Sequence, residues 1–207
     1  MNETSNRYDA EAIAELSAGA ELYGFLGKVF LALPDASFLD ELFAMDWSRF
    51  DIEGFQLIGR FAESHAGRPR KDVLEQLGCD RAALVRGVGF GAIEPPYESL
   101  YRGASSNVSI GGLNRFYSKA GYAVDKSVKD TSDQIGVELS FVSLMYAKEL
   151  ESAQAGDGET AAAVRETRER FFAEHLSCWA ADYARAMEDA AQTDFYRGIA
   201  QIIQAAV

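Results

Sequence analysis

Histidine and cysteine are scarce in this chain, and each occurs only twice in 207 residues. A Ser-His-Asp or Cys-His catalytic site would have to use His65 or His175, and no nucleophile motif accompanies either residue. His175 and Cys178 have the spacing of a metal-binding pair on one helix, but a second pair of ligands is lacking. We therefore expect no enzymatic activity, no metal site and no bound cofactor.

Long apolar runs are also lacking. None approaches the roughly 20 residues that a membrane-spanning helix needs, and Met1–Tyr8 has no basic flank followed by an apolar segment, as a signal peptide would. Cys79 and Cys178 lie about a hundred residues apart and form no disulfide framework, so we expect free, buried thiols in a reducing compartment. The sequence predicts a cytoplasmic protein without stable membrane insertion.

Basic residues are in deficit. The chain has 20 Lys and Arg against 32 Asp and Glu, which gives a formal net charge of −12. Nucleic acids and anionic membrane surfaces reward clustered basic residues, so the balance disfavours both as partners. It favours a cationic partner, although solubility alone also explains an acidic surface.

Apolar residues at helical spacing are abundant, and strand-like alternation is almost absent. We predict an all-α fold: a single helical domain of about eight to nine helices in two closely packed lobes, at about 8–121 and 130–207, joined by a loop-rich middle. Helices are expected over about 9–33, 38–45, 52–65, 71–77, 81–90, 113–120, 130–155, 160–190 and 195–206.

Three ring side chains are assigned to the core. Tyr23 lies on the apolar stripe of the first expected helix, and His175 and Trp179 lie one turn apart on the helix expected over 160–190. A core histidine would hydrogen-bond a backbone carbonyl. These residues are expected to support the fold.

The main break in the helical pattern is Glu94–Gly103, with the sequence Glu-Pro-Pro-Tyr-Glu-Ser-Leu-Tyr-Arg-Gly. Its adjacent prolines remove two backbone donors and favour extended geometry in the residues before them. Tyrosines, glutamates, a serine and an arginine surround this break. A stiff loop with polar and aromatic side chains is a good place to bind a partner. The alternative is that Tyr97 and Tyr101 fill the gap between the lobes.

Residues 95–101, Pro-Pro-Tyr-Glu-Ser-Leu-Tyr, resemble the Pro-Tyr-Glu-Ser-Val-Tyr loop of the TorD/DmsD-type redox-enzyme maturation chaperones. Residues 133–142 resemble the family's Asp-His-Ile-x-x-Glu-Leu-x-Phe-Met helix, with Gln134 in place of histidine. Residues 171–179 resemble its Phe-x-x-x-His-Leu-x-x-Trp helix, and Phe195-Tyr196 fits an aromatic pair in its last helix. The aromatic motif that precedes the family's loop is reduced here to Phe90.

The resemblance spans the chain from about Tyr8 and implies a TorD-like, cytoplasmic chaperone. Such a chaperone binds the twin-arginine signal peptide, the apo form of a molybdenum-cofactor oxidoreductase, or both. It supports cofactor insertion and prevents premature export of the catalytic subunit. A monomer and a domain-swapped dimer are both compatible with lobes joined by a long loop.

A twin-arginine peptide needs carboxylates for its guanidinium groups and an apolar surface beside them. Candidate carboxylates are Glu98, Asp133 and Glu138, while Phe90, Tyr97 and Tyr101 could supply apolar and cation–π contacts. The full predicted binding set is Phe90, Pro96, Tyr97, Glu98, Ser99, Tyr101, Asp133, Gln134 and Glu138.

Structural alternatives exist for the second half of this set. Thr131 to Gln134 fits a capping box, in which Thr131 is the N-cap and Gln134 reaches back to it. Asp133 would then favour the positive end of the helix dipole. Glu138, one turn later, is expected to be partly buried with a polar partner. A second function also stays open: an all-helical assembly or ligand-binding subunit that contacts a mature enzyme without signal-peptide specificity.

Overall fold

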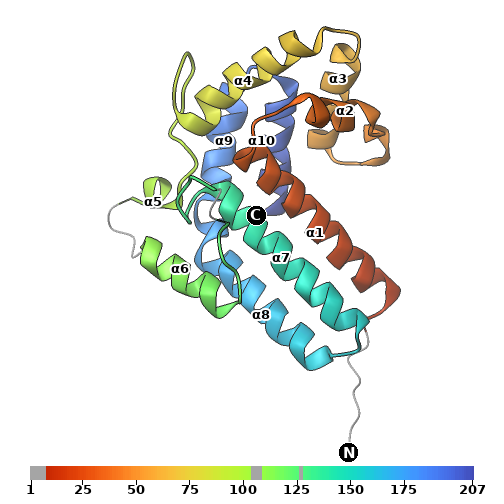
Figure 1. The fold of residues 1–207 in the computed structure, drawn as a ribbon, viewed down its shortest axis with the longest axis vertical. Helices are drawn as coiled ribbons and strands as arrows, with labels where there is room; N and C mark the ends of the chain where they lie inside the picture. Colours follow the sequence, from red (N-terminus) through yellow and green to blue (C-terminus); the bar gives the residue numbers. More distant parts are fainter. Residues whose placement is uncertain (1–7, 104–108, 126–127) are drawn as a thin grey trace, which may run out of the picture. The chain divides into compact units, whose positions relative to one another are not determined.

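The computed structural model describes residues 8–103, 109–125 and 128–207, and these form ten α-helices, two short 3-10 helices and no strand (Figure 1). The all-helical prediction is confirmed. None of the described helices combines the length and the apolarity needed to cross a bilayer. The elements are α1 (Ala10–Leu31), α2 (Ala36–Ala44), η1 (Trp47–Arg49), α3 (Glu53–His65), α4 (Arg70–Arg86), α5 (Glu98–Tyr101), α6 (Ile110–Lys119), α7 (Ile135–Gln154), α8 (Gly158–Glu174), η2 (Leu176–Cys178), α9 (Ala180–Ala190) and α10 (Asp194–Ala206).

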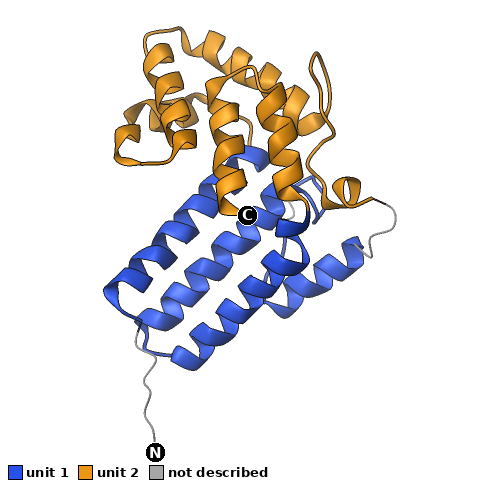
Figure 2. Cartoon of the chain, turned by 180° about the vertical axis from the view of Figure 1, so that it is seen from behind, with its two compact units in different colours: residues 1–31, 107–178 blue, residues 32–106, 179–207 orange. Residues whose placement is uncertain are grey.

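The chain forms two compact units, and each is assembled from two separate stretches of sequence (Figure 2). Unit 1 comprises residues 1–31 and 107–178 and contains α1, α6, α7 and α8. Unit 2 comprises residues 32–106 and 179–207 and contains α2 to α5, α9 and α10. This division differs from the sequence intervals 8–121 and 130–207, because helices far apart in sequence pack together in each unit.

Unit 1 is built on the close contact of α1 with α7, and α8 packs on α7 (Figure 1). A Cβ atom at Gly27 would lie 2.5 Å from Ser140 Oγ and 3.1 Å from the carbonyl oxygen of Gly136. The two helix backbones therefore approach so closely that only glycine fits at Gly27. Ser143 strengthens this pair by donating its hydroxyl to the Ala20 carbonyl at 2.7 Å.

Unit 2 has a comparable crossing between α3 and α10. A Cβ atom at Gly54 would lie 2.6 Å from the carbonyl oxygen of Gly198, so both positions exclude larger side chains. Apolar residues on α10 fill the space around this contact, and Ile199 and Ile203 are fully buried. The crossing fixes where the ends of α3 and α10 lie within the unit.

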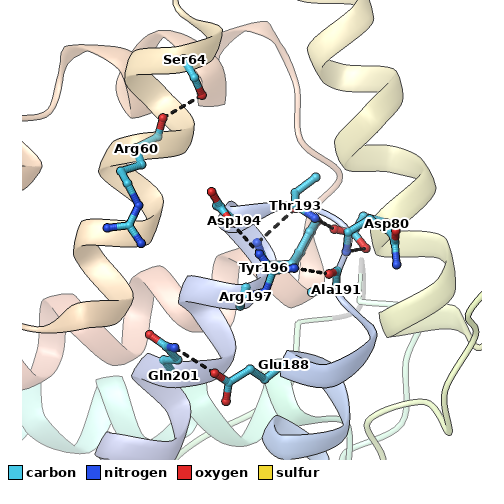
Figure 3. Close-up of polar contacts among 11 residues, drawn as sticks. Arg60, Ser64, Asp80, Glu188, Ala191, Thr193, Asp194, Tyr196, Arg197 and Gln201 are labelled. Atoms are coloured by element: carbon cyan, nitrogen blue, oxygen red, sulfur yellow. Dashed lines mark hydrogen bonds and ion pairs between the residues drawn. The ribbon is translucent and has the colours of Figure 1, made fainter.

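The buried Asp80 carboxylate of α4 holds the corner between α9 and α10 (Figure 3). Its Oδ2 accepts from the Thr193 backbone N at 2.9 Å and from the Thr193 hydroxyl at 2.6 Å, and its Oδ1 accepts from Gln192 N at 3.1 Å. The Thr193 hydroxyl oxygen in turn caps α10 by accepting from Tyr196 N at 3.3 Å. One carboxylate thus accepts hydrogen bonds from backbone N–H groups before α10 that have no partner within the helix.

Helix ends were predicted best where a local signal marks them. Asp9 caps α1 by accepting from Ala12 N at 2.9 Å, as expected. Gly121 follows α6 with a φ of 72°, which confirms its expected role as a C-terminal glycine. The two helices expected over 71–77 and 81–90 are in fact the single helix α4, because Gly78 stays within it and buried apolar residues run on both sides.

The prediction of one long helix over residues 160–190 is wrong. The structure breaks it into α8, η2 and α9, with non-helical backbone at His175 (ψ −86°) and Trp179 (φ −153°). No glycine or proline marks the break, so the sequence rules for helix ends miss it. The break coincides with the boundary of the two units: Leu176 belongs to unit 1, and Trp179 belongs to unit 2.

Candidate functional site

The loop that follows α4 begins at a left-handed residue, Gly87, with a φ of 65°. It is anchored at its base, because Val88 N donates to Ala82 O at 3.1 Å and Ile93 N donates to Ala83 O at 3.3 Å. Pro95 closes the base, and its Cδ would lie 3.2 Å from a Cβ atom at Gly87. The loop is therefore a defined excursion from the end of α4.

Phe90 lies in this excursion and is 96% exposed. Val88 is exposed as well, and no charged residue occurs between Gly87 and Ile93. A phenylalanine left in water forgoes the roughly 1.5–3 kcal/mol that burial of its side chain would contribute. The loop thus presents an uncharged, apolar side chain that is available to a partner.

The proline-rich segment leads into the short helix α5 (Figure 1). Pro96 is buried, Tyr97 is half-buried and Ser99 is exposed. Glu98 is fully buried, and its Oε1 accepts from Arg102 Nη1 at 2.6 Å. The predicted arginine-binding carboxylate is therefore already paired with an arginine of its own loop. Arg102 was missing from the predicted set, although its i,i+4 spacing from Glu98 is a recognised signal for an ion pair.

Tyr101 is half-buried and packs against aromatic residues of unit 2. Its ring packs edge-on against Tyr183 and at a tilt against Trp179, with centroids 5.7 Å away in both cases. Its hydroxyl donates to the Glu94 carbonyl at 2.9 Å. Burial, with smaller contributions from the Glu94 and Asp182 charges, raises the pKa of Tyr101 to about 12. This residue fastens the loop to α9.

The start of α7 holds the second group of predicted residues, and the predicted capping box is wrong. Gln134 is itself the N-cap, and its Oε1 accepts from Gly136 N at 2.6 Å. Thr131 does not cap the helix; its hydroxyl donates to Asp133 Oδ1 at 2.6 Å. The box fails because α7 begins at Ile135, too late for Thr131 to be its N-cap.

Asp133, Gln134 and Glu138 are all buried. Gln134 Nε2 has no hydrogen-bond acceptor among the described residues. A buried amide donor without an acceptor costs about 1–3 kcal/mol, so this nitrogen is a candidate donor to a ligand. Residues 90–101 belong to unit 2 and residues 133–138 to unit 1, so the predicted binding set consists of one group in each unit.

Comparison with known proteins gives the family. The sequence profile of the nitrate reductase delta subunit family matches residues 53–185, which is 133 of the 207 residues. The chain belongs to this family. The match includes the proline-rich loop, the start of α7 and the break at His175 to Trp179, but not Phe195-Tyr196. A comparison with curated proteins gave no significant match.

Members of the nitrate reductase delta subunit family are redox-enzyme maturation chaperones of the TorD type. They are non-catalytic, serve the assembly of molybdoenzymes and bind the catalytic subunit of such enzymes. The family resemblance, the TorD-like fold and the assignment as a chaperone rather than an enzyme are thereby confirmed.

The residues assigned to the core of this chaperone differ in burial. Tyr23 and Trp179 are buried. Tyr23 stacks on Tyr146 with centroids 5.5 Å apart, within unit 1. His175 is half-buried at the end of α8, where it stacks on Phe171 with centroids 5.0 Å apart. In the sequence, His175 directly precedes η2 and Trp179 directly follows it, so the two residues do not lie on one continuous helix.

Both cysteines are free, as expected, but the expectation that they are buried is wrong. Cys79 and Cys178 are exposed. Cys178 lies in η2, where its thiol donates to the Ala173 carbonyl at 3.3 Å. Within the described parts of the chain, no three His, Cys, Asp or Glu side chains are grouped so that they could hold a metal ion.

Proposed function

We propose that this chaperone binds the twin-arginine signal peptide of its client molybdoenzyme in the cytoplasm, where the family's members act, and so delays export until assembly is complete. The observation that carries the proposal is the contact of Glu98 with Arg102. The fully buried Glu98 carboxylate accepts a guanidinium at 2.6 Å and is therefore oriented for arginine.

In this proposal, a peptide arginine replaces Arg102 in the contact with Glu98. Its side chain is 27% exposed, whereas that of Glu98 is 0% exposed. Arg102 can therefore turn towards solvent and yield its place to a peptide arginine, which keeps the buried carboxylate paired throughout. Leaving that carboxylate without a cation would be strongly unfavourable, so the exchange must replace one guanidinium with another.

The apolar part of a signal peptide requires a different surface. Phe90 and Val88 present apolar side chains on an uncharged loop, and Leu100 of α5 is also exposed. We assign the apolar segment of the peptide to this part of unit 2. Ser99 is exposed beside Glu98 and carries a hydroxyl that a peptide backbone could contact.

The start of α7 contributes separately through unit 1. Gln134 Nε2 is assigned as a donor to a backbone carbonyl of the client, since it has no acceptor among the described residues. Asp133 and Glu138 place two buried carboxyl groups at this helix terminus. Their proposed role is to favour a cationic segment, and it is tested by the variant Glu138→Gln.

Isothermal titration with the twin-arginine signal peptide of a molybdoenzyme catalytic subunit tests the proposal. The Arg-Arg peptide should bind more tightly than its Lys-Lys counterpart, because lysine cannot form the forked contact. Glu98→Gln and Glu138→Gln should each weaken binding by about 1–3 kcal/mol. Glu94→Gln, an exposed change in the same loop, is the matched control and should leave the affinity unchanged.

Arg102→Ala distinguishes the exchange mechanism from a purely structural pair. If a peptide arginine takes the place of Arg102, this variant should bind the peptide more tightly, because the competing guanidinium is gone. Equal weak binding of both peptides would refute signal-peptide recognition. It would leave the second function, a chaperone that contacts the mature subunit without signal-peptide specificity.

A further inference from the structure

The acidic residues of this chain are unevenly distributed. None occurs from Ser99 to Val124, a stretch of 26 residues, although the chain has 32 in 207. Within the stretch, α6 carries Arg115 and Lys119 one turn apart, and such a spacing places both side chains on one face of the helix. A protein of net charge −12 thus has one helix whose only charges are positive.

This helix borders a groove in unit 1. A hollow of about 320 Å³ lies between α6 and α8, and Arg115, Phe116 and Lys119 line its α6 side. On the α8 side it is lined by Thr167, Arg170 and Glu174. It shares Lys119, Ala120 and Thr167 with a second hollow of about 620 Å³, so the two hollows are neighbours.

The first hollow combines three cations with the aromatic ring of Phe116. The Arg170 guanidinium lies over the Phe116 ring, 5.0 Å from its centroid, which orients it without neutralising it. Among the described carboxylates, none forms an ion pair with Arg115, Lys119 or Arg170. Glu174 is the single acidic residue lining the first hollow, so its lining has a net positive charge.

The lining of the second hollow has no net formal charge, because Glu151 and Glu159 balance Lys119 and Lys148. Met145, Ala163 and Val164 contribute apolar side chains to it, and Lys148 donates from Nζ to Ala120 O at 2.9 Å. A ligand that fills both hollows would therefore need negative charge at one end and apolar groups at the other.

We propose that the α6–α8 groove docks an acidic segment of a protein partner, with carboxylates towards Arg115, Lys119 and Arg170 and apolar side chains towards Met145, Ala163 and Val164. A small anion would use only the cations and leave the apolar length unfilled. A twin-arginine peptide would be repelled by the same cations. The groove is thus a second site, and it does not depend on signal-peptide binding.

A short fluorescent peptide of alternating glutamate and leucine is the probe, and its counterpart with glutamine in place of glutamate is the ligand control. Anisotropy at about 0.15 M ionic strength gives the affinities. The glutamate peptide should bind the whole protein at least about tenfold more tightly than the glutamine peptide, because several of its carboxylates can pair with the three cations of the groove at once.

Arg115→Glu and Arg170→Glu should each weaken binding of the glutamate peptide by about tenfold or more. Arg60→Glu is the matched control: it makes the same change in net charge at an exposed arginine of α3, and it should leave the affinity within about twofold. Circular dichroism confirms that each variant is folded. Heteronuclear NMR of the complex should show shifts concentrated in α6 and α8.

Three results would overturn the proposal. If Arg60→Glu weakened binding of the glutamate peptide as much as Arg115→Glu and Arg170→Glu do, the overall charge of the protein would explain the result. If inorganic phosphate displaced the peptide when both were present at the same total concentration of negative charge, the groove would be a site for small anions. Equal binding of the glutamate and glutamine peptides would remove the charge argument altogether.

Discussion

Arg168 and Glu149 form a two-donor contact in unit 1: Nη2 and Nε of the arginine donate to Glu149 Oε2, at 2.8 Å and 3.3 Å. The other oxygen accepts from Arg165 Nε at 2.8 Å and from the Tyr8 hydroxyl at 3.2 Å. Arg168 also lies over the Tyr146 ring, 4.0 Å from its centroid. A fully buried carboxylate thus joins α7, α8 and the segment before α1.

Glu149→Gln should destabilise the protein by about 3–5 kcal/mol, because it leaves two partly buried guanidinium groups without their negative partner. Urea unfolding monitored by circular dichroism measures the loss. Glu151→Gln, an exposed change on the same helix, is the control and should stay within about 0.5 kcal/mol. Equal effects of the two changes would contradict a central role for Glu149.

Gly198→Ala should cost about 1–3 kcal/mol or more, because its Cβ would press on the backbone of Gly54 and on Ile58. Gly67→Ala is the control, since no atom lies within 4 Å of a Cβ atom there. Thermal melting of both variants measures the difference. Equal melting temperatures would show that α3 and α10 can separate at little cost.

Alkaline pH should destabilise unit 2. Burial raises the pKa of Tyr101 to about 12, while an unfolded tyrosine has a pKa of about 10. The unfolded chain loses this proton first, so the stability contributed by Tyr101 is complete below about pH 10 and is lost as pH rises towards 12. Burial also raises the pKa values of Tyr183 and Tyr196, which act in the same direction.

Urea midpoints measured across this pH range should fall for the wild-type protein and fall less steeply for Tyr101→Phe, which cannot titrate. The comparison of slopes separates titration from the lost hydrogen bond to Glu94, because that loss lowers stability at every pH. An identical slope in the variant would contradict the assignment to Tyr101.

Phe90→Ser should weaken binding of the client by about tenfold, or roughly 1.4 kcal/mol, without lowering the melting temperature. The reason is that a side chain that is 96% exposed contributes contacts only when a partner covers it. Titration against the signal peptide and against the catalytic subunit measures the effect. Phe172→Ser, a half-buried change on α8, is the contrasting variant and should lower stability.

Periodicity and caps predicted much of the helical framework. The limits of α2, α3 and α10 agree within two residues with expectation. The N-caps Asp35 and Thr193, which the prediction did not use, would have placed the starts of α2 and α10 to the residue. The division at His175 to Trp179 could not be predicted in this way. It arises from long-range packing: Trp179 contacts Tyr101, which is remote in sequence.

The candidate site shows the same limit. The sequence identified Glu98 and Gln134 as polar residues in unusual places. It did not reveal that Glu98 is paired with Arg102, or that Gln134 is an N-cap. Both facts depend on where α5 and α7 begin, and element boundaries are the least predictable feature of a helical sequence. The sequence did not predict the α6–α8 groove, because Arg170 lies near Arg115 only when α8 packs on α6.

The interleaving of the two units sets an order for biosynthesis. The helices α2, α3 and α4 are made early, but the contacts of Gly54 with Gly198 and of Asp80 with Thr193 wait for α10, which follows all the other helices. Every helix of unit 1, by contrast, has been made once Cys178 is added. During synthesis on the ribosome, unit 1 can therefore fold before α10 has been made. Until then, the apolar faces of α3 and α4 that α10 will cover stay exposed.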